Sequence, residues 1–504
     1  MPLPRKDPTK SYWIEQAPSP LKDFQSGPLP ERTDVLIIGA GYTAATLAYW
    51  LRAFSPADAV PSITVLDARD ICGGATGRNG GQLRPISFDA YADWAATYGR
   101  DTARELIEHE VAHIPAFEAL VAAEKLDCDL HVSRTWSAYM TDEEAAKGVA
   151  QVEGMRAAEG GWVDRVVGDV VATRDPEEAG RLTRVKGARG AVGVPGGRIW
   201  PYKFVHGLFA KLLQTPGFEL HAHTPAVEVL PCRNSNMEWT VATARGDIRA
   251  KAVVYANNRW VEHLAPEFRG VITAARNQMA AIRLDGSRWA GGKLDEQAMQ
   301  FWDGLHNNYY VTFPQYNTLV IGGAKQVLVR PTTRPDGSAG PPDLSLWHDN
   351  DDEDKNAPGA EAYFRSWPQR DLVGWGGPSE AKLAGTNPSA DASTGGLWTG
   401  VMSHSIDSMP FVGPLDCERV AAGQYVAAGW NGHGMPRILL ATHALAGQVL
   451  AGLGVQATPG PEWARRLRIP RLPAPFEVSP ERLRRVTAAA REHAAAQEKA
   501  KAKL

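Results

Sequence analysis

Short apolar runs separated by helix-like segments form the clearest pattern at the start of the chain. Residues 34–41 hold an apolar run that ends in glycine, residues 44–51 have the composition of a helix, and residues 62–67 form a second apolar run that ends in Asp67. Strand, helix and strand within roughly 30 residues predict a βαβ unit with parallel strands.

The rest of the chain alternates strand-like and helix-like segments less regularly. We expect helices at 101–123, 202–213 and from 436 onward, strands at 218–223, 239–243 and 252–256, and a hairpin of 309–313 and 319–322. The proline-rich residues 1–30 predict an extended surface arm, and 479–504 predict a capped, charged helix. Residues 330–395 predict a surface insertion. Its acidic run, 349–354, lacks the sixth-position glycine of an EF-hand loop, so we expect a solvated face.

Composition limits the class of protein. Hydrophobic residues make up 44% and charged residues 22%, as in globular proteins, and the net charge of −3 offers no basic field for nucleic acid or an anionic membrane. Cys72, Cys128, Cys232 and Cys417 lie far apart, which is typical of a reduced intracellular protein. The uncharged stretch 35–51 is too short for a bilayer span. We expect a soluble protein without a membrane or nucleic-acid partner.

A dinucleotide-binding fingerprint lies inside the predicted βαβ unit. Gly39 permits the tight turn, Gly41 lets the backbone approach a pyrophosphate, and the small Ala44 lets the helix lie close to the sheet. The helix N-terminus would face the phosphates, and Asp67 after the second strand could accept hydrogen bonds from a ribose. The alternative is a tight turn without a ligand. The fingerprint alone does not choose between NAD and FAD.

Two further glycine-rich segments suit a large ligand. Residues 72–82 contain five glycines in eleven residues, together with Arg78 and Asn79, which favours a backbone lying against a planar or phosphorylated group; a plain flexible loop is the alternative. Residues 425–435 are a strand followed by a glycine loop, and the helix after them would direct its N-terminal partial positive charge at the ligand.

These three segments together resemble the D-amino-acid-oxidase-like superfamily of flavin amine oxidases, which includes the sarcosine, glycine and gamma-glutamylputrescine oxidases. The segment 75–82 and the Ser11-Tyr-Trp arm are most similar to the gamma-glutamylputrescine oxidase branch. The resemblance covers residues 31 to about 455, apart from the insertion 330–395. The cofactor-binding residues it implies are Gly39, Gly41, Tyr42, Thr43, Ala44, Asp67, Ala68, Arg69, Gly74, Ala75, Thr76, Arg78, Asn79, Gly80, Gly81, Gln82, Val227, Gly429, Asn431, Gly432, His433, Gly434 and Met435.

The resemblance also implies an α/β fold in two parts. A Rossmann-like FAD-binding domain would come from residues 31–95, 190–262 and 396–456, and a substrate domain built on an antiparallel sheet from 96–189 and 263–395. An arm (1–30) and a tail helix (457–504) would complete the chain. The cysteine and histidine that carry covalent flavin in some relatives have no counterpart at 400–402 or after the second strand, so we expect non-covalent FAD. The lysine with which sarcosine oxidases bind a substrate carboxylate aligns with Pro436, and Arg437 is only adjacent.

The implied reaction is the oxidation of a C–N bond in an amine or amino-acid derivative. The amine would give hydride to the flavin, the imine would hydrolyse, and dioxygen would reoxidise the flavin to yield hydrogen peroxide. His404, Trp430 and His433 are the catalytic candidates on the substrate side, although His433 could simply fill a turn. A flavin dehydrogenase with a quinone or protein acceptor, and a non-catalytic dinucleotide sensor, remain as alternatives.

A zinc-hydrolase signature competes with this interpretation. His109-Glu-Val-Ala-His113 spells H-E-x-x-H in a predicted helix, which would place two imidazoles on one face with Glu110 as base. The longer metzincin pattern fails at Ala116 and Ala119, and no third ligand is evident, so we expect no metal site.

The C-terminal tripeptide resembles a peroxisomal address. Ala502-Lys503-Leu504 fits the small-basic-leucine class that an import receptor reads, and peroxide release would suit that compartment. We expect a peroxisomal location in a eukaryote and a cytoplasmic one otherwise; the alternative is an ordinary lysine- and alanine-rich helix end.

Overall fold

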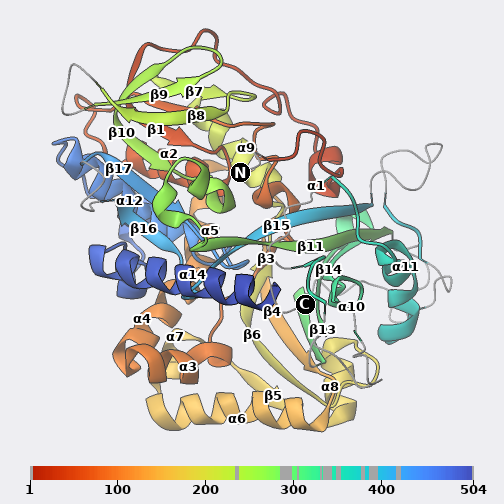
Figure 1. Cartoon of the computed structure of the whole chain (residues 1–504). Helices are drawn as coiled ribbons and strands as arrows, with labels where there is room; N and C mark the ends of the chain where they lie inside the picture. The colour runs from red at the N-terminus through yellow and green to blue at the C-terminus, as the bar shows by residue number, and fades with distance from the viewer. Residues whose placement is uncertain are drawn as a thin grey trace.

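The computed structural model describes residues 4–232, 238–283, 298–303, 306–329, 332, 343–347, 354–375, 381–384, 396–415 and 422–501. These residues form two mixed layers of sheet and helix that meet along one side (Figure 1). The predicted α/β fold is confirmed, with a mostly parallel first sheet and a mostly antiparallel second sheet. Among the helices in these described stretches, none is long and apolar enough to cross a bilayer.

The first sheet is built around the predicted βαβ unit. Its strands follow the order β16 (Phe411–Pro414), β17 (Gln424–Ala428), β10 (Ile248–Tyr255), β1 (Arg32–Ile38), β2 (Ile63–Leu66) and β7 (Phe218–His221), with the hairpin β8 (Ala226–Pro231) and β9 (Trp239–Thr243) attached to β10. Strands β17, β10, β1, β2 and β7 run parallel. Val35, Leu36 and Ile37 are fully buried, as expected for a strand covered on both faces.

Three helices cover this sheet and begin at its ligand-binding edge. They are α2 (Tyr42–Phe54), α9 (Pro201–Leu212) and α12 (Ile438–Gly452), and α2 packs against both of the others. The chain leaves β1 through the glycine turn directly into α2, and it leaves β17 through residues 429–437 into α12. Because parallel strands end at the same edge, both turns face the same cavity.

The second sheet forms the wall opposite these turns. Its order is β15 (Leu397–Ser405), β11 (Ile272–Arg283), β14 (Thr318–Gly323), β13 (His306–Phe313), β12 (Ala298–Asp303), β4 (His131–Tyr139), β6 (Gly190–Arg198) and β3 (Gln82–Leu83), with β5 (Val171–Thr173) beside β6. Its flanking helices are α3 (Phe88–Tyr98), α4 (Arg100–Val111), α5 (His113–Glu124), α6 (Asp142–Glu159), α7 (Trp162–Val166), α8 (Pro176–Thr183), α10 (Lys325–Leu328) and α11 (Ala360–Asp371). The predicted hairpin is confirmed as β13 and β14.

Three strands lie in a different layer from the one the sequence predicts. Strands β3, β6 and β15 fall within the stretches expected to form the FAD-binding domain, yet they pair in the second sheet. For β15 the cause is its register, since nine of its residues pair antiparallel with β11 from Ile272 to Ala280. The chain therefore crosses between the layers several times, and the two sheets share one interior.

The predicted helix over residues 101–123 is interrupted. Helix α4 ends at Val111 and α5 begins at His113, with Ala112 at the junction. Pro115 lies in the first turn of α5, where its missing N–H is tolerated, but it cannot donate the hydrogen bond that would continue α4. The break therefore falls inside the H-E-x-x-H string.

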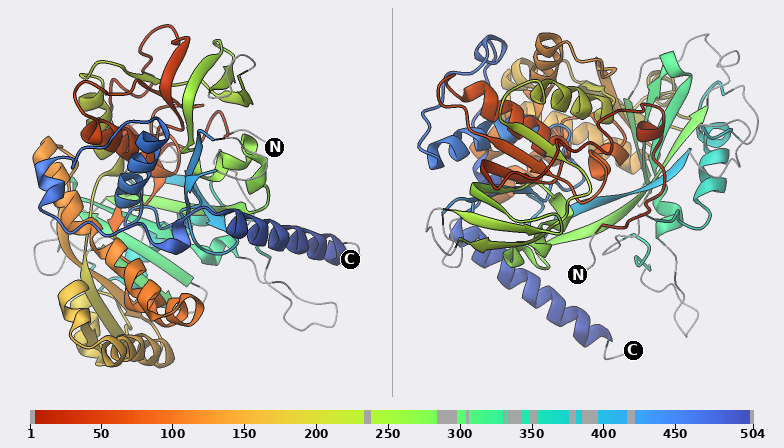
Figure 2. Two further views of the ribbon diagram at one scale, coloured as in Figure 1. Left: turned by 90° about the vertical axis from the view of Figure 1, so that its left-hand side faces the viewer. Right: turned by 90° about the horizontal axis from the view of Figure 1, so that it is seen from above.

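The two ends of the chain differ in how they are held. The N-terminal arm contains a short helix, α1 (Tyr12–Glu15), whose Trp13 is fully buried between Trp200, Phe313 and Trp398. At the other end, α13 (Glu462–Arg465) precedes α14 (Pro480–Lys501), which projects from the body (Figure 2). The predicted C-terminal helix is confirmed, whereas Ala502-Lys503-Leu504 lies outside the described residues.

Candidate functional site

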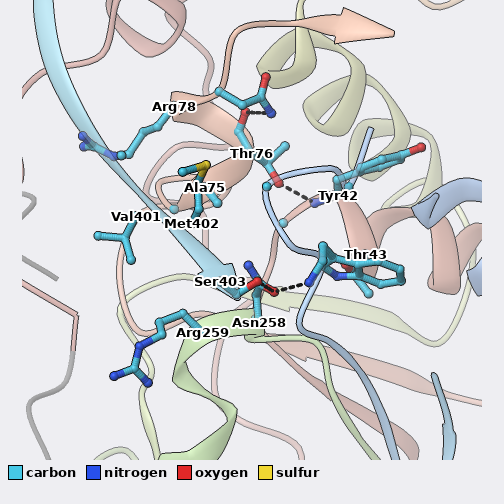
Figure 3. Close-up of a pocket in the computed structure, with 18 of the residues that line it drawn as sticks. Tyr42, Thr43, Ala75, Thr76, Arg78, Asn258, Arg259, Val401, Met402 and Ser403 are labelled. Atoms are coloured by element: carbon cyan, nitrogen blue, oxygen red, sulfur yellow. Dashed lines mark hydrogen bonds between the residues drawn. The ribbon is translucent and has the colours of Figure 1, made fainter. Parts of the chain in front are cut away.

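A cavity of about 510 Å³ lies between the turns of the first sheet and the second sheet. The three glycine-rich segments predicted from the sequence all contribute to its wall, and strands β11 and β15 close the other side. Figure 3 shows part of this wall, with Tyr42, Thr76 and Ser403 among the labelled residues. Such a concave site, walled by separate segments of chain, is where α/β proteins bind cofactors.

The glycine turn after β1 leaves no room for a side chain. Gly39 has φ +103°, and a Cβ there would lie 2.7 Å from the Ala256 carbonyl oxygen at the end of β10. A Cβ on Gly41 would lie 3.1 Å from the Thr76 hydroxyl oxygen. Gly39 is therefore required by the fold itself, while Gly41 keeps the start of α2 open to a close ligand.

Asp67 fixes this turn from the next strand. Its carboxylate accepts hydrogen bonds from the Ala40 N–H at 2.7 Å and from the Arg69 N–H at 2.9 Å, and it lines the cavity. Burial raises the pKa of the Asp67 carboxyl, and these two backbone donors partly oppose the effect. Each carboxylate oxygen retains a lone pair, so the carboxylate can still accept a ligand hydroxyl.

The loop of residues 72–82 docks onto the start of α2. The Tyr42 N–H donates to the Thr76 hydroxyl at 3.1 Å, a contact drawn in Figure 3. Arg78 is buried and donates to the carbonyl oxygens of Gly73 at 2.9 Å and Thr399 at 2.9 Å. Arg78 therefore ties this loop to β15, so the loop is held between the two sheets.

The N-terminal arm reinforces the same loop. The Trp13 indole N–H donates to the Asn79 carbonyl oxygen at 2.6 Å, and the Ser11 hydroxyl donates to the Gly77 carbonyl oxygen at 2.5 Å. The Ser11-Tyr-Trp motif thus acts as a brace behind the glycine loop.

Asn258 holds the glycine loop of residues 429–437, before α12, in place. It lies after β10 with φ 49°, and its side-chain oxygen accepts from the Gly429 N–H at 3.0 Å and from the Ser403 hydroxyl at 2.8 Å (Figure 3). One amide therefore joins the glycine loop before α12 to strand β15. Neighbouring Asn257 also lines the cavity, and its side-chain oxygen is buried without a hydrogen-bond partner among the described residues.

A buried ion network lies behind His433. Glu110 is fully buried, with one carboxylate oxygen 2.7 Å from Arg437 Nε and the other 3.3 Å from His433 Nε2. Burial alone would raise the pKa of Glu110, but Arg437 and His433 outweigh it and hold this pKa at about 2. Burial also lowers the pKa of the His433 imidazole, which Glu110 partly opposes. His433 itself lines the cavity.

The H-E-x-x-H string is used for packing. The His109 and His113 rings do lie side by side, with centres 5.0 Å apart, but three of their four ring nitrogens contact backbone groups. His113 donates through Nδ1 to the His109 carbonyl oxygen at 2.7 Å and accepts through Nε2 from the Leu440 N–H at 3.1 Å. His109 Nε2 lies 3.2 Å from the Arg437 carbonyl oxygen. Burial lowers the pKa of His109 to about 4 and that of His113 well below its ordinary value, so both rings are neutral and serve the start of α12.

Most of the predicted site residues line the cavity. Those on its wall are Gly39, Gly41, Tyr42, Thr43, Asp67, Ala68, Arg69, Gly74, Ala75, Thr76, Arg78, Asn79, Gly80, Gly81, Gln82, Trp430, Asn431, Gly432, His433, Gly434 and Met435.

Four predicted residues do not line it. The lining part of β15 ends at Ser403, one residue before His404. Ala44 is buried in α2, and Gly429 holds the turn against Asn258. Val227, which is expected to bind through its backbone, is 57% exposed, and its neighbours 224–226 line the cavity.

The sequence analysis missed residues that enter the wall from distant segments. Asn257, Asn258 and Arg259 follow β10, and Lys325 and Trp347 come from the region after β14. None of them was assigned to the site from the sequence, and the sheet pairing brings them there.

The wall fits a flavin dinucleotide. The glycine turn and the N-terminus of α2 suit a pyrophosphate, Asp67 suits a ribose, and the unpartnered Asn257 oxygen offers an acceptor to a polar ligand group. A second helix, α12, starts just after the loop of residues 429–437, which also lines the cavity.

Comparisons with known proteins agree with this geometry. The family model described as DAO, FAD dependent oxidoreductase, matches residues 34–451. Gamma-glutamylputrescine oxidoreductase of Escherichia coli (strain K12) is 29% identical over 238 residues, which are 46% of this chain and 51% of that protein. The match thus spans about half the length of this curated relative.

Solved structures share the fold. Glycine oxidase from Geobacillus kaustophilus aligns with a TM-score of 0.61 at 17% identity, covering 89% of this chain and 99% of that one. L-amino acid deaminase from Proteus myxofaciens gives 0.61 at 14% identity, with 94% and 99% covered, and L-proline dehydrogenase from P. horikoshii gives 0.55 at 17% identity, with 86% and 96% covered. With the family model matched from the first strand to the end of α12, the chain belongs to the DAO family of FAD-dependent oxidoreductases.

Proposed function

We propose that the protein binds FAD non-covalently and oxidises a C–N bond of an amine or amino-acid derivative to an imine. The observation that carries this proposal is one cavity with the dinucleotide turn, the loop of residues 72–82 and His433 on one side and the second sheet on the other. The printed names of the relatives, an oxidoreductase of gamma-glutamylputrescine and oxidases and deaminases of amino acids, support an amine as the substrate.

Bound FAD would supply the two-electron acceptor. The residues of segments 39–43, 67–69 and 74–82 would hold it, and Asn257 would offer an acceptor to one of its polar groups. The chain would bring the amine against the same wall and exclude bulk water from it.

His433 is the proposed proton-handling residue. Nε2 lies 3.3 Å from a Glu110 carboxylate oxygen, and the lowered pKa favours a neutral ring at pH 7. With the ring proton on Nε2, facing Glu110, Nδ1 would be the basic atom. A neutral imidazole oriented by a buried carboxylate is an arrangement suited to accept the proton of a substrate ammonium. Trp430, whose indole nitrogen is buried without a hydrogen-bond partner among the described residues, would provide an aromatic wall next to it.

We propose dioxygen as the electron acceptor, with hydrogen peroxide as the second product. The alternative is a dehydrogenase that passes electrons to a quinone or a protein. Reduced protein mixed with air-saturated buffer distinguishes them, because an oxidase regains its yellow colour within seconds and a dehydrogenase stays pale until a quinone is added.

The function is tested by purifying the yellow protein and screening amines. Acid precipitation should release free FAD into the supernatant, whereas a yellow pellet would contradict non-covalent binding. A panel of amino acids, N-alkyl amino acids and polyamines should contain at least one substrate that yields stoichiometric peroxide and a carbonyl product. A protein that holds FAD and oxidises no amine in the panel would contradict the proposal.

The peroxisomal address at Ala502-Lys503-Leu504 stays a proposal for a eukaryotic source. A reporter carrying the native C-terminus should then overlap a peroxisomal marker, and deletion of Leu504 should abolish the overlap. Diffuse signal from the intact tail would contradict it.

A further inference from the structure

The cations on the cavity wall differ in whether they already have an anionic or carbonyl partner. Arg84 pairs with Asp89, Arg259 pairs with Glu262, and Arg78 donates to backbone carbonyls. Arg437, which follows the lining residue Pro436, is turned away from the cavity and pairs with Glu110. These four guanidinium groups are therefore committed to the protein itself.

Arg69, a further lining residue, donates to the Arg5 carbonyl oxygen at 3.1 Å, so Lys325 is the exception among the Lys and Arg side chains on the described part of the wall. Lys325 begins α10 directly after β14, where Ala324 takes a left-handed conformation with φ 51° and turns the chain toward the cavity. Its ammonium lies 4.5 Å from the centre of the Trp347 ring, and no carboxylate in the described part of the chain forms an ion pair with it. Burial lowers the pKa of Lys325, and no neighbouring charge opposes the shift.

The aromatic partner of Lys325 is itself fixed. The Trp347 carbonyl oxygen accepts from the Arg276 N–H of β11 at 2.8 Å, and the Trp347 N–H donates to the Leu344 carbonyl oxygen at 2.9 Å. The backbone of Trp347 is therefore held in place, and its ring faces the ammonium on the second-sheet side of the cavity. A cation–π contact compensates only part of the cost of desolvating an ammonium, and an anionic ligand would compensate the rest.

We propose that Lys325, supported by Trp347, binds a carboxylate of the substrate and so makes the enzyme selective for amines that carry an acidic group over matched neutral amines. This inference rests on the proposed amine oxidation at the same cavity. Lys325 acts here as an anchor that remains protonated throughout, and His433 on the opposite segment handles the proton. If Lys325 were instead the base that deprotonates the substrate, Lys325→Arg should lose activity, because a guanidinium does not give up its proton at neutral pH.

The test compares Lys325→Met and Lys325→Arg with a control, Lys211→Met, which changes an exposed lysine on α9 away from the cavity. Each FAD-loaded protein is assayed with the best amino-acid substrate of the panel and with its primary amide, which keeps the amine and removes the negative charge. A second readout needs no turnover: calorimetric titration of each variant with acetate, with acetamide as the neutral probe.

The expected result is a clear preference of the wild type and Lys211→Met for the acid over the amide. Lys325→Met should lower kcat/KM for the acid on the order of 10- to 100-fold, with little change for the amide, and should abolish acetate binding. Lys325→Arg should keep both the preference and acetate binding, because it keeps the positive charge.

Three outcomes would overturn the inference. The first is equal kcat/KM for the acid and the amide in the wild type, and the second is an unchanged ratio of these two values in Lys325→Met. The third is a Lys325→Arg variant that loses activity on both substrates and no longer shows the pH dependence of the wild-type rate, as expected if Lys325 were the base. If neither acid nor amide is oxidised by any variant, the proposed function fails, while the acetate titration still decides whether Lys325 binds a carboxylate.

Discussion

Glu110→Gln tests the buried ion network of Glu110, Arg437 and His433, which links the H-E-x-x-H segment to the cavity. The substitution keeps the shape of the side chain and removes the charge of a fully buried group between Arg437, which is also buried, and His433, whose side chain is 20% exposed. It leaves the Arg437 guanidinium buried without its anion, which is among the most costly single changes in a protein interior.

The size of the effect follows from the pKa of Glu110. This pKa falls from an ordinary 4.5 to about 2 in the folded protein. At about 1.36 kcal/mol per pH unit, the difference corresponds to roughly 3 kcal/mol of folding free energy at neutral pH. With an unfolding entropy of about 2.1 cal/mol/K per residue, this lowers the Tm of a 504-residue chain by about 3 °C.

The assay is thermal unfolding of the FAD-free protein at pH 7, with Glu118→Gln as the matched control. Glu118 is exposed on α5, so its variant should melt with the wild type. Because a depressed carboxyl pKa stabilises the fold above pH 4.5 and loses that effect as the pH falls toward 2, the Glu110→Gln deficit should be constant from pH 7 to 5. A Glu110→Gln protein that melts within 0.5 °C of the Glu118→Gln control would refute the network's role.

Three further predictions concern the fold and the cofactor. Gly39→Ala should abolish FAD retention, measured by the yellow colour after gel filtration, because its Cβ would meet the Ala256 carbonyl oxygen; Gly246→Ala, which also has a positive φ but open space, should retain FAD. Trp13→Ala should destabilise the protein by about 3–5 kcal/mol and weaken FAD binding measured by fluorescence titration, because the loop of residues 72–82 loses its brace. His443 is buried with a pKa of about 4, below its ordinary 6.5, so acid favours the unfolded chain. Between pH 6.5 and 5 the fold should lose about 2 kcal/mol from this residue, and His443→Gln should melt with a flatter pH dependence.

Local rules predicted the parts of the site that depend on one stretch of chain. The turn at Gly39 and Gly41, the position of Asp67 on the cavity wall and the helix start after residues 429–435 follow from spacing within one strand-turn-helix unit. The positive φ of Gly39 is also a local requirement, and the sequence signals it directly.

Non-local pairing decided the parts that the sequence did not predict. Strand β15 belongs to the second sheet because it pairs with β11, more than 100 residues earlier. In this position its residues line the cavity only as far as Ser403, so His404 does not. Lys325 and Asn258 carry no motif, and Trp13 looked like part of a surface arm although it is fully buried. The H-E-x-x-H string has helical spacing, but Pro115 breaks the helix within reach of it.

The central claim, that this cavity oxidises the C–N bond of an amine, is tested most directly by anaerobic single-turnover reduction with a substrate deuterated at its α-carbon. The FAD-loaded protein mixed without oxygen with the best amine of the panel should lose its visible flavin absorbance in one phase. The α-deuterated amine should slow this phase several-fold, and one equivalent of carbonyl product should form. Absorbance that is unchanged by every amine, or bleaching that is insensitive to deuterium and yields no carbonyl product, would contradict the account.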